Sequence, residues 1–231
     1  MKTATVQSPA RAAEGRIREI DPSNRKDLAT IGRLHVELLD FGPMSALGER
    51  FIRDVCYRIQ MVDGLLHVAL YEVDGVPAGF VAYTGQSTTF HRTALKNHVF
   101  YVLWVLGVSL LENPLRLSGL PRVLRVVRSR RGEAALADGP LGELVCLVAR
   151  PEYLEPGFVR RSGLRVSQEL VHHAMKRLRQ QGHSRMRLIV DADNTRTLFL
   201  YHRLGARFEP YSLGGKPSLQ VWFDLEPPKE Q

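Results

Sequence analysis

The chain has 231 residues, of which 44% are hydrophobic and 24% are charged, as in an ordinary globular protein. This length suits one large domain, or one domain that carries an insertion. A formal net charge of +8 indicates an anionic partner. Aromatic-studded RNA-binding patterns and Cys/His fingers are absent from the sequence, which argues against nucleic acid as that partner.

The ends and the cysteines suggest a reduced, cytoplasmic protein. Residues 1–15 contain no apolar core of an export signal, and we expect them to form a disordered arm, as residues 227–231 form a tail. Cys56 and Cys146 lie in apolar contexts without CxxC spacing, which is typical of reduced core residues. Residues 16–226 are predicted to form a single domain.

The first half of that domain predicts a strand, two helices and a β-hairpin. A strand at 16–20 is followed by Ser23 or Asn24, either of which can cap a helix. A break at Phe41-Gly42-Pro43 separates it from a second helix, at about 46–61. Asp74-Gly75 between two strand-like runs is a strong signal for a tight hairpin turn.

Residues 86–138 are predicted to be a helical insert between the third and fourth strands. The insert has a net charge of +5, and residues 97–111 are nearly all apolar but too few to span a membrane. Three interpretations stay open: an extra helical layer over a sheet edge, a lid near an acceptor site, or a peripheral membrane element at 97–131.

The second half predicts a strand–helix–strand unit. An apolar run at 144–149 is followed by an irregular passage at 150–159 and a basic turn at 160–165. A helix with Val166, Leu170, Ala174 and Leu178 at four-residue steps then ends at Gly182. A strand at 186–190, a short helix ending at 204–205 and a hairpin of strands at 207–211 and 219–225 complete the domain. A helix that begins beside a basic turn suits a phosphate.

These parts resemble the GNAT superfamily of acyl-CoA-dependent N-acyltransferases in their order. The stronger motif is Asn194-Thr195-Arg196-Thr197-Leu198-Phe199-Leu200-Tyr201-His202-Arg203-Leu204-Gly205, which keeps the family's Asn, its Tyr seven residues later and its Leu-Gly. It departs from the family at Thr197, where alanine is usual, and at Ala206, where an aromatic residue is usual. The resemblance implies a mixed α/β fold, in which helices flank a central, mostly antiparallel sheet.

The family's pyrophosphate turn, Q/R-x-x-G-x-G/A, fits this chain in two registers. One begins at Arg160 and keeps Gly163, with Arg165 where a small residue is usual. The other keeps the buried face of the helix, so that Arg165 and Ser167 take the two glycine positions, and we favour this one. The resemblance implies that acetyl-CoA or another acyl-CoA is bound by residues of the strand, the turn and the second motif: Leu147, Val148, Arg160, Arg161, Ser162, Gly163, Leu164, Arg165, Val166, Ser167 and Asn194.

The implied reaction is attack of a primary amine on the thioester in a ternary complex. By resemblance, a main-chain N–H near Leu147 or Val148 stabilises the oxyanion and Tyr201 protonates the leaving thiolate. Glu143, at the start of the strand, is the candidate base, or else a solvent-facing strand end. The acceptor is a small-molecule or peptide amine, no metal is implied, and a homodimer stays open. The alternatives are a catalytically silent domain that binds CoA or a protein, and a basic nucleic-acid-binding regulator.

Overall fold

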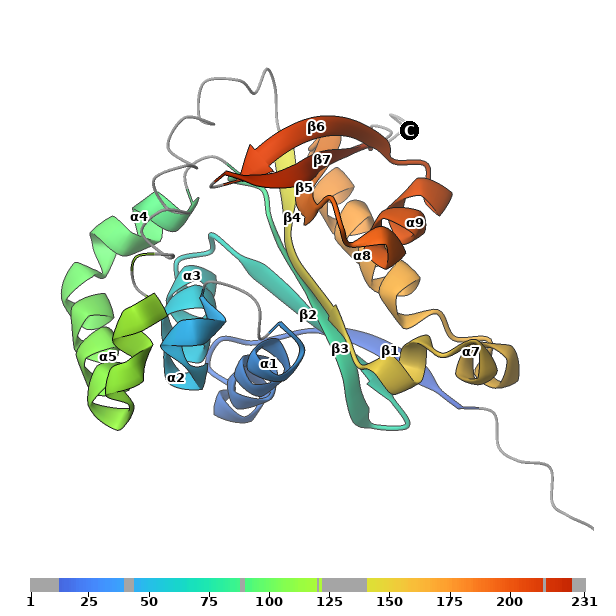
Figure 1. Cartoon of the computed structure of the whole chain (residues 1–231). Coiled ribbons are helices and arrows are strands. Elements are labelled where there is room, and N and C mark those ends of the chain that lie inside the picture. Colours follow the sequence, from blue (N-terminus) through green and yellow to red (C-terminus); the bar gives the residue numbers. More distant parts are fainter. Residues whose placement is uncertain are drawn as a thin grey trace, which may run out of the picture.

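A seven-stranded mixed sheet forms the centre of the molecule, with helices on both faces (Figure 1). The computed structural model describes residues 13–39, 44–87, 90–119, 121, 141–213 and 215–225. The strand order is β1-β2-β3-β4-β5-β7-β6, and all neighbours are antiparallel except β4 and β5. The predicted fold class is therefore confirmed. Most of the predicted arm, the tail and residues 122–140 of the insert lie outside the described residues.

The first half follows the predicted order of elements. Asn24 caps α1, because its side-chain oxygen accepts from the N–H groups of Lys26 and Asp27. Asp74 and Gly75 both have positive φ, as a two-residue hairpin turn requires. The elements are β1 (Gly15–Glu19), α1 (Arg25–Leu38), η1 (Ser45–Leu47), α2 (Glu49–Phe51), η2 (Ile52–Arg58), α3 (Ile59–Val62), β2 (His67–Val73) and β3 (Val76–Thr84).

The second predicted helix contains a π-helical stretch, η2, that its sequence did not indicate. The apolar side chains of Ile52, Val55 and Ile59 are spaced as an ordinary α-helix would space them, so the pattern does not distinguish the two forms. The main-chain N–H of Ile59 donates to the carbonyl of Asp54, five residues earlier. Such stretches are rare and often lie at functional sites.

The described part of the insert is a helical layer, consisting of α4 (Phe90–Asn97), α5 (Val99–Glu112) and η3 (Pro114–Gly119). Val102 and Val105 of α5 are buried against Phe51 and Val55. The layer therefore packs on α2 and η2, and not on a sheet edge as one of the three interpretations expected.

The second half corrects one prediction. Residues 150–159, expected to be irregular, form a 3-10 helix and a short α-helix, each with a proline in its first turn, where proline is tolerated. Arg160, Arg161 and Ser162 consequently belong to the last turn of a helix rather than to a loop. The elements are β4 (Leu141–Ala149), η5 (Pro151–Leu154), α7 (Pro156–Ser162), α8 (Val166–Gln180), β5 (Arg185–Asp191), α9 (Thr195–Arg203), β6 (Arg207–Leu213) and β7 (Lys216–Asp224).

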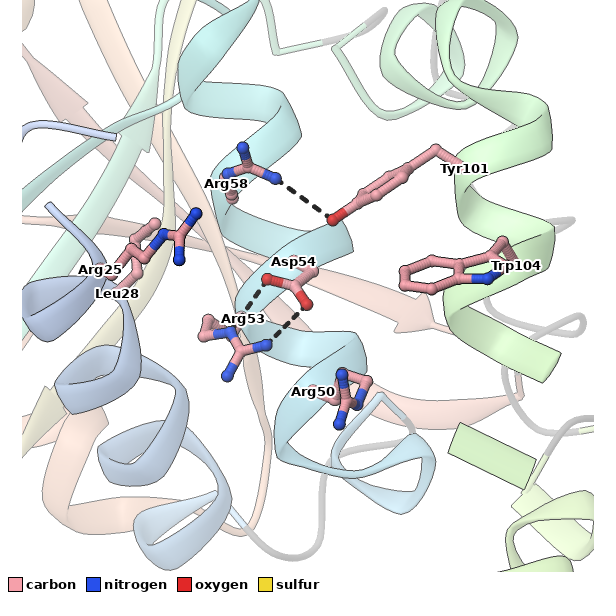
Figure 2. A pocket seen from close by; sticks show the side chains of 8 residues that line it. All are labelled: Arg25, Leu28, Arg50, Arg53, Asp54, Arg58, Tyr101 and Trp104. Carbon is pink, nitrogen blue, oxygen red and sulfur yellow. Dashed lines mark hydrogen bonds and ion pairs between the residues drawn. The ribbon is translucent and has the colours of Figure 1, made fainter. Parts of the chain in front are cut away.

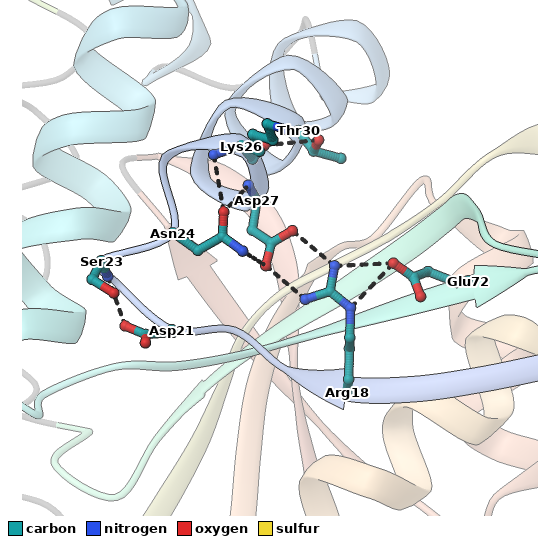
Figure 3. A network of polar contacts seen from close by, with 8 residues as sticks. All are labelled: Arg18, Asp21, Ser23, Asn24, Lys26, Asp27, Thr30 and Glu72. Carbon is teal, nitrogen blue, oxygen red and sulfur yellow. Dashed lines mark hydrogen bonds and ion pairs between the residues drawn. The ribbon is translucent and has the colours of Figure 1, made fainter.

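Two apolar cores lie on opposite faces of the sheet. One face is covered by α8, whose residues at the predicted four-residue steps are all buried, and the other by α1 and the helical run 49–62. On that second side, Arg18 of β1 binds both Asp27 oxygens at 2.6 and 2.7 Å and Glu72 of β2 at 3.0 Å (Figure 3). This guanidinium ties α1 to the first two strands.

Candidate active site

The strands β4 and β5 pair over a short length only. Leu141, Gly142 and Glu143 pair in parallel with Arg185–Arg187, and no described strand pairs with the rest of β4 on that side. Opposite β3, Ala82 pairs with Cys146 and Tyr83 with Leu144, so Val145 is an extra, bulged residue. Leu147 and Val148 lie in this section, where sheet pairing leaves one edge of β4 unused. The main-chain N–H and C=O groups there can form hydrogen bonds to a ligand.

The N-terminus of α8 offers free donors. The N–H groups of Val166, Ser167 and Gln168 have no hydrogen-bond partner among the described residues. The side chains of Arg160, Arg161 and Arg165 are exposed near this end of the helix. An anion would therefore meet both main-chain donors and positive charge.

A carboxylate also occupies this helix end. The N–H of Arg165, which is the N-cap of α8, donates to Oε1 of Glu169 over 2.8 Å. The hydroxyl of Tyr71 on β2 donates to the other carboxylate oxygen over 2.7 Å. Glu169 thus partly satisfies the site that an anionic ligand would use, and its negative charge opposes such a ligand.

The turn between α7 and α8 requires a glycine at position 163 for structural reasons, whether or not a cofactor binds. Gly163 has φ of +74° and its N–H donates to Val159, which makes it the left-handed cap of α7. The N–H of Leu164 donates to the hydroxyl of Ser162 over 3.2 Å. Because α8 begins only at Val166, this geometry favours the register in which Arg165 and Ser167 take the glycine positions.

Tyr201 is buried on α9, and its ring meets Phe223 of β7 edge-on at 5.9 Å between centroids. Burial raises the pKa of Tyr201. The hydroxyl therefore stays protonated at neutral pH, the state that a proton donor needs. Asn194 caps α9, since its side-chain oxygen accepts from the N–H of Thr197 over 3.2 Å, so this residue has a structural role without CoA.

Glu143 lies in a buried ion pair. The hydroxyl of Ser87 donates to Oε2 of Glu143 over 2.6 Å, and Arg187 approaches the same oxygen at 3.3 Å. As the candidate base, Glu143 was expected to point into an acceptor cleft. Instead, Glu143 stands opposite Arg187 in the paired section of β4 and β5, which does not support that role.

A second group of polar side chains, which sequence reasoning missed, reaches β4 from the helical side. Nδ1 of His35 on α1 lies 2.6 Å from the hydroxyl of Tyr57 on η2, and this hydroxyl hydrogen-bonds to Cys146. Burial lowers the pKa of His35 to about 4. Burial also raises the pKa of Cys146 to about 12, partly offset by the hydrogen bond from Tyr57. The three side chains link α1 to the middle of β4, and no local motif marks them.

The depressed pKa of His35 predicts a loss of stability in mild acid. The unfolded histidine binds a proton below its ordinary pKa of 6.5, but the folded one only below about 4. Stability is therefore complete above pH 6.5 and falls as the pH drops towards 4, by up to about 3 kcal/mol. Chemical unfolding of wild type and His35→Gln across this range measures the difference.

A matched variant tests whether the pH dependence of stability belongs to His35 and not to other histidines. His172 is exposed, and His172→Gln should keep the wild-type pH profile. Burial lowers the pKa of His67 as well, so some dependence on pH should remain in His35→Gln. Equal slopes in wild type and His35→Gln would contradict the prediction.

Within the described residues, no three or more His, Cys, Asp or Glu side chains are grouped to hold a metal ion. In the same part of the chain, none of the helices combines the length and apolar character needed to cross a membrane.

Solved structures with the same fold share little sequence with this chain. The PaiA N-acetyltransferase from Thermoplasma acidophilum, in complex with coenzyme A, is 14% identical over 90% of this chain and 98% of its own, with a TM-score of 0.51. A protein from Desulfovibrio desulfuricans assigned to the GNAT family is 12% identical, covering 93% and 100%, with a TM-score of 0.52.

A third similar structure is the NatC complex bound to Gag peptide and CoA, at 13% identity over 92% of this chain and 99% of the matched one, with a TM-score of 0.53. No protein-family model matches the sequence, and no curated protein matches it. The likeness is thus one of architecture. The chain has the fold of the GNAT acetyltransferases.

Proposed function

We propose that this chain is an N-acyltransferase, which moves an acetyl or other acyl group from acyl-CoA to a primary amine. The observation that carries the proposal is the juxtaposition of β4, one edge of which pairs with no described strand beyond Glu143, with the N-terminus of α8 and its unpaired N–H groups. The free edge suits a thioester, and the helix end suits a pyrophosphate. The PaiA structure with coenzyme A supports the same ligand.

The proposed chemistry takes place in a ternary complex. The amine nitrogen forms a bond to the thioester carbon, and main-chain N–H near Leu147 or Val148 donates to the oxyanion. The C–S bond then breaks, and the thiolate takes a proton from Tyr201, whose hydroxyl is protonated at neutral pH.

Direct attack fits the thiols of this chain better than a covalent acyl-cysteine. Burial raises the pKa values of both Cys56 and Cys146 to about 12, so both are protonated at neutral pH. The thiolate is the nucleophilic form of cysteine. Neither cysteine is therefore set up to accept the acyl group.

The proton that the amine loses needs an acceptor other than Glu143, because Glu143 is held in a buried ion pair. We propose that His35 and Tyr57 conduct this proton, since they hydrogen-bond to one another and Tyr57 reaches Cys146 on β4. His35 is only partly buried, so it connects the site to solvent. Its pKa is lowered to about 4, so at neutral pH it passes a proton on to solvent rather than retaining it.

Acetyl-CoA should stabilise the folded protein. At a concentration one hundred times its dissociation constant, a ligand that binds only the folded state adds about 2.7 kcal/mol to the free energy of unfolding. Thermal unfolding with and without acetyl-CoA measures this. If neither acetyl-CoA nor CoA at millimolar concentration raises the melting temperature, the proposal fails and a nucleic-acid-binding role gains support.

Two charge variants at one helix end localise the CoA site. Arg165→Glu should weaken CoA at least tenfold, or by about 1.4 kcal/mol, because it places negative charge beside phosphate. Glu169→Gln should strengthen CoA by about two- to fivefold, because it removes a charge that opposes the ligand at the helix terminus. Calorimetric titration distinguishes them, and unchanged affinity in both variants would place the pyrophosphate elsewhere.

The acceptor class stays broad. The NatC structure holds a peptide, which supports a peptide amine, and small-molecule amines remain equally compatible with the proposal. We also propose peripheral membrane contact through residues 97–131, supported by exposed apolar side chains on α5 and η3, namely Phe100, Leu103, Trp104, Leu111 and Leu115. Cytoplasmic location and a homodimer stay predictions.

A further inference from the structure

An arginine-rich cavity of about 470 Å³ lies between α1, the α2–η2 run and α5. Figure 2 shows its polar lining: four arginines and Asp54 from the first two elements, facing Tyr101 and Trp104 from α5. The arginines are Arg25, Arg50, Arg53 and Arg58. This size is within the range of small-molecule sites.

Two of the four guanidinium groups are already balanced by carboxylates. Arg53 binds Asp54 through two hydrogen bonds of 2.9 and 2.7 Å, and Arg50 binds Glu112 over 2.8 Å. Arg25 and Arg58 form no ion pair with any described residue. Arg58 instead donates to the hydroxyl of Tyr101 over 3.3 Å. The cavity is therefore lined by two arginines that no described carboxylate pairs with.

The π-helical turn places two of the arginines on one side. Arg53 and Arg58 are five residues apart, a spacing that would separate their directions widely in an α-helix. In η2 the hydrogen bonds run from residue i to residue i+5, so these two side chains project from the same side. Tyr57, in contrast, points to His35 and Phe80 in the interior, so the cavity is separate from the candidate active site.

The aromatic wall of the cavity is held in place. Tyr101 and Trp104 stack with ring centroids 6.0 Å apart, and Trp104 is 58% exposed. Beneath them, α5 is fixed by its buried valines and by Ser109, which donates to the carbonyl of Leu47. An exposed indole next to guanidinium groups can stack with a planar ring whose anionic substituent the arginines bind.

We propose that this cavity binds a small molecule in which a phosphate monoester is joined to a planar ring. Arg25 and Arg58 bind the phosphate, and Trp104 stacks with the ring. Asp54 fixes Arg53 and offsets part of the repulsion among the four cations. This site does not depend on the proposed acyl transfer, because it shares no residue with the CoA site.

Phenyl phosphate is the test probe, since it combines the two features and lacks the adenosine of CoA. We expect calorimetric titration to show saturable binding, at least tenfold tighter than that of inorganic phosphate or of phenol alone. The titration is repeated with saturating CoA, which should leave the affinity unchanged. The fluorescence of a Trp222→Phe variant, in which Trp104 is the only tryptophan, should change with the same dissociation constant.

Three variants separate charge from stacking. Arg25→Gln combined with Arg58→Gln should weaken phenyl phosphate at least tenfold, whereas Arg33→Gln, which removes an exposed arginine of α1 outside the cavity, should leave its affinity unchanged. Trp104→Leu should remove the preference for phenyl phosphate over inorganic phosphate. Each variant is first shown to have the wild-type melting temperature.

Several results would overturn the proposal. Absence of saturable binding would do so, as would an equal loss of affinity in Arg33→Gln, which would indicate unspecific charge attraction. Competition between phenyl phosphate and CoA would assign the binding to the active site. Binding to phosphatidylserine vesicles but not to phenyl phosphate would assign the arginines and Trp104 to a membrane surface instead.

Discussion

Replacing Tyr201 with phenylalanine should lower the turnover of acyl transfer by roughly 10²-fold or more, the usual contribution of a general acid. The variant lacks one hydroxyl, on a buried ring whose packing against Phe223 is kept. CoA affinity and melting temperature should therefore change little. Steady-state kinetics with calorimetric titration of CoA measures the two effects separately.

A matched control shows whether the effect belongs to this tyrosine. Tyr153 on η5 is partly buried and packs edge-on against Phe158, so Tyr153→Phe is the same chemical change in a similar setting. Its turnover should equal that of the wild type. Full activity in Tyr201→Phe would assign Tyr201 to packing.

Replacing Glu143 with glutamine should destabilise the protein by about 3–5 kcal/mol, because it removes the negative charge from a buried ion pair. For a domain of this size the melting temperature should fall by roughly 10 °C. The turnover of the protein that remains folded should be close to that of the wild type. Denaturant unfolding and kinetics below the transition measure both quantities.

Removing both charges tests whether the pair is structural. The double variant Glu143→Leu with Arg187→Met should recover most of the lost stability, since apolar residues of similar volume often replace a buried ion pair without loss. A stable but inactive Glu143→Gln would contradict this account and restore Glu143 as the base.

The elements of the fold could be predicted from sequence where local chemistry specifies them. Asn24 caps a helix with its own side chain, and Asp74-Gly75 adopts positive φ as the tight turn requires. The phase of α8 follows from Val166, Leu170 and Ala174, which are buried as their spacing predicts. The helices at 151–162 were missed because prolines that open a helix look, in sequence, like prolines that break one.

The candidate site was predicted less completely, because its chemistry depends on which side chains from separate elements meet in the folded protein. The motif around Asn194 and Tyr201 lies on a helix, as predicted, and the structure adds that Tyr201 is buried. Glu143 was predicted to be the candidate base from its place at the start of the strand, and nothing near it in sequence reveals Arg187, which stands opposite it only in the folded sheet. The same applies to His35, Tyr57 and Cys146, which come from three separate elements.

The sequence by itself determined the order of strands and helices, their caps and turns, and the buried face of α8, because each depends on residues a few positions apart. Tertiary structure alone decided which strand pairs with which, where β4 and β5 part, which carboxylate is neutralised, and that four arginines surround one cavity. These features join residues that are far apart in the chain. Hydrophobic burial brings such residues together, and because it depends on the apolar area removed from water, the local sequence does not specify which distant residues meet.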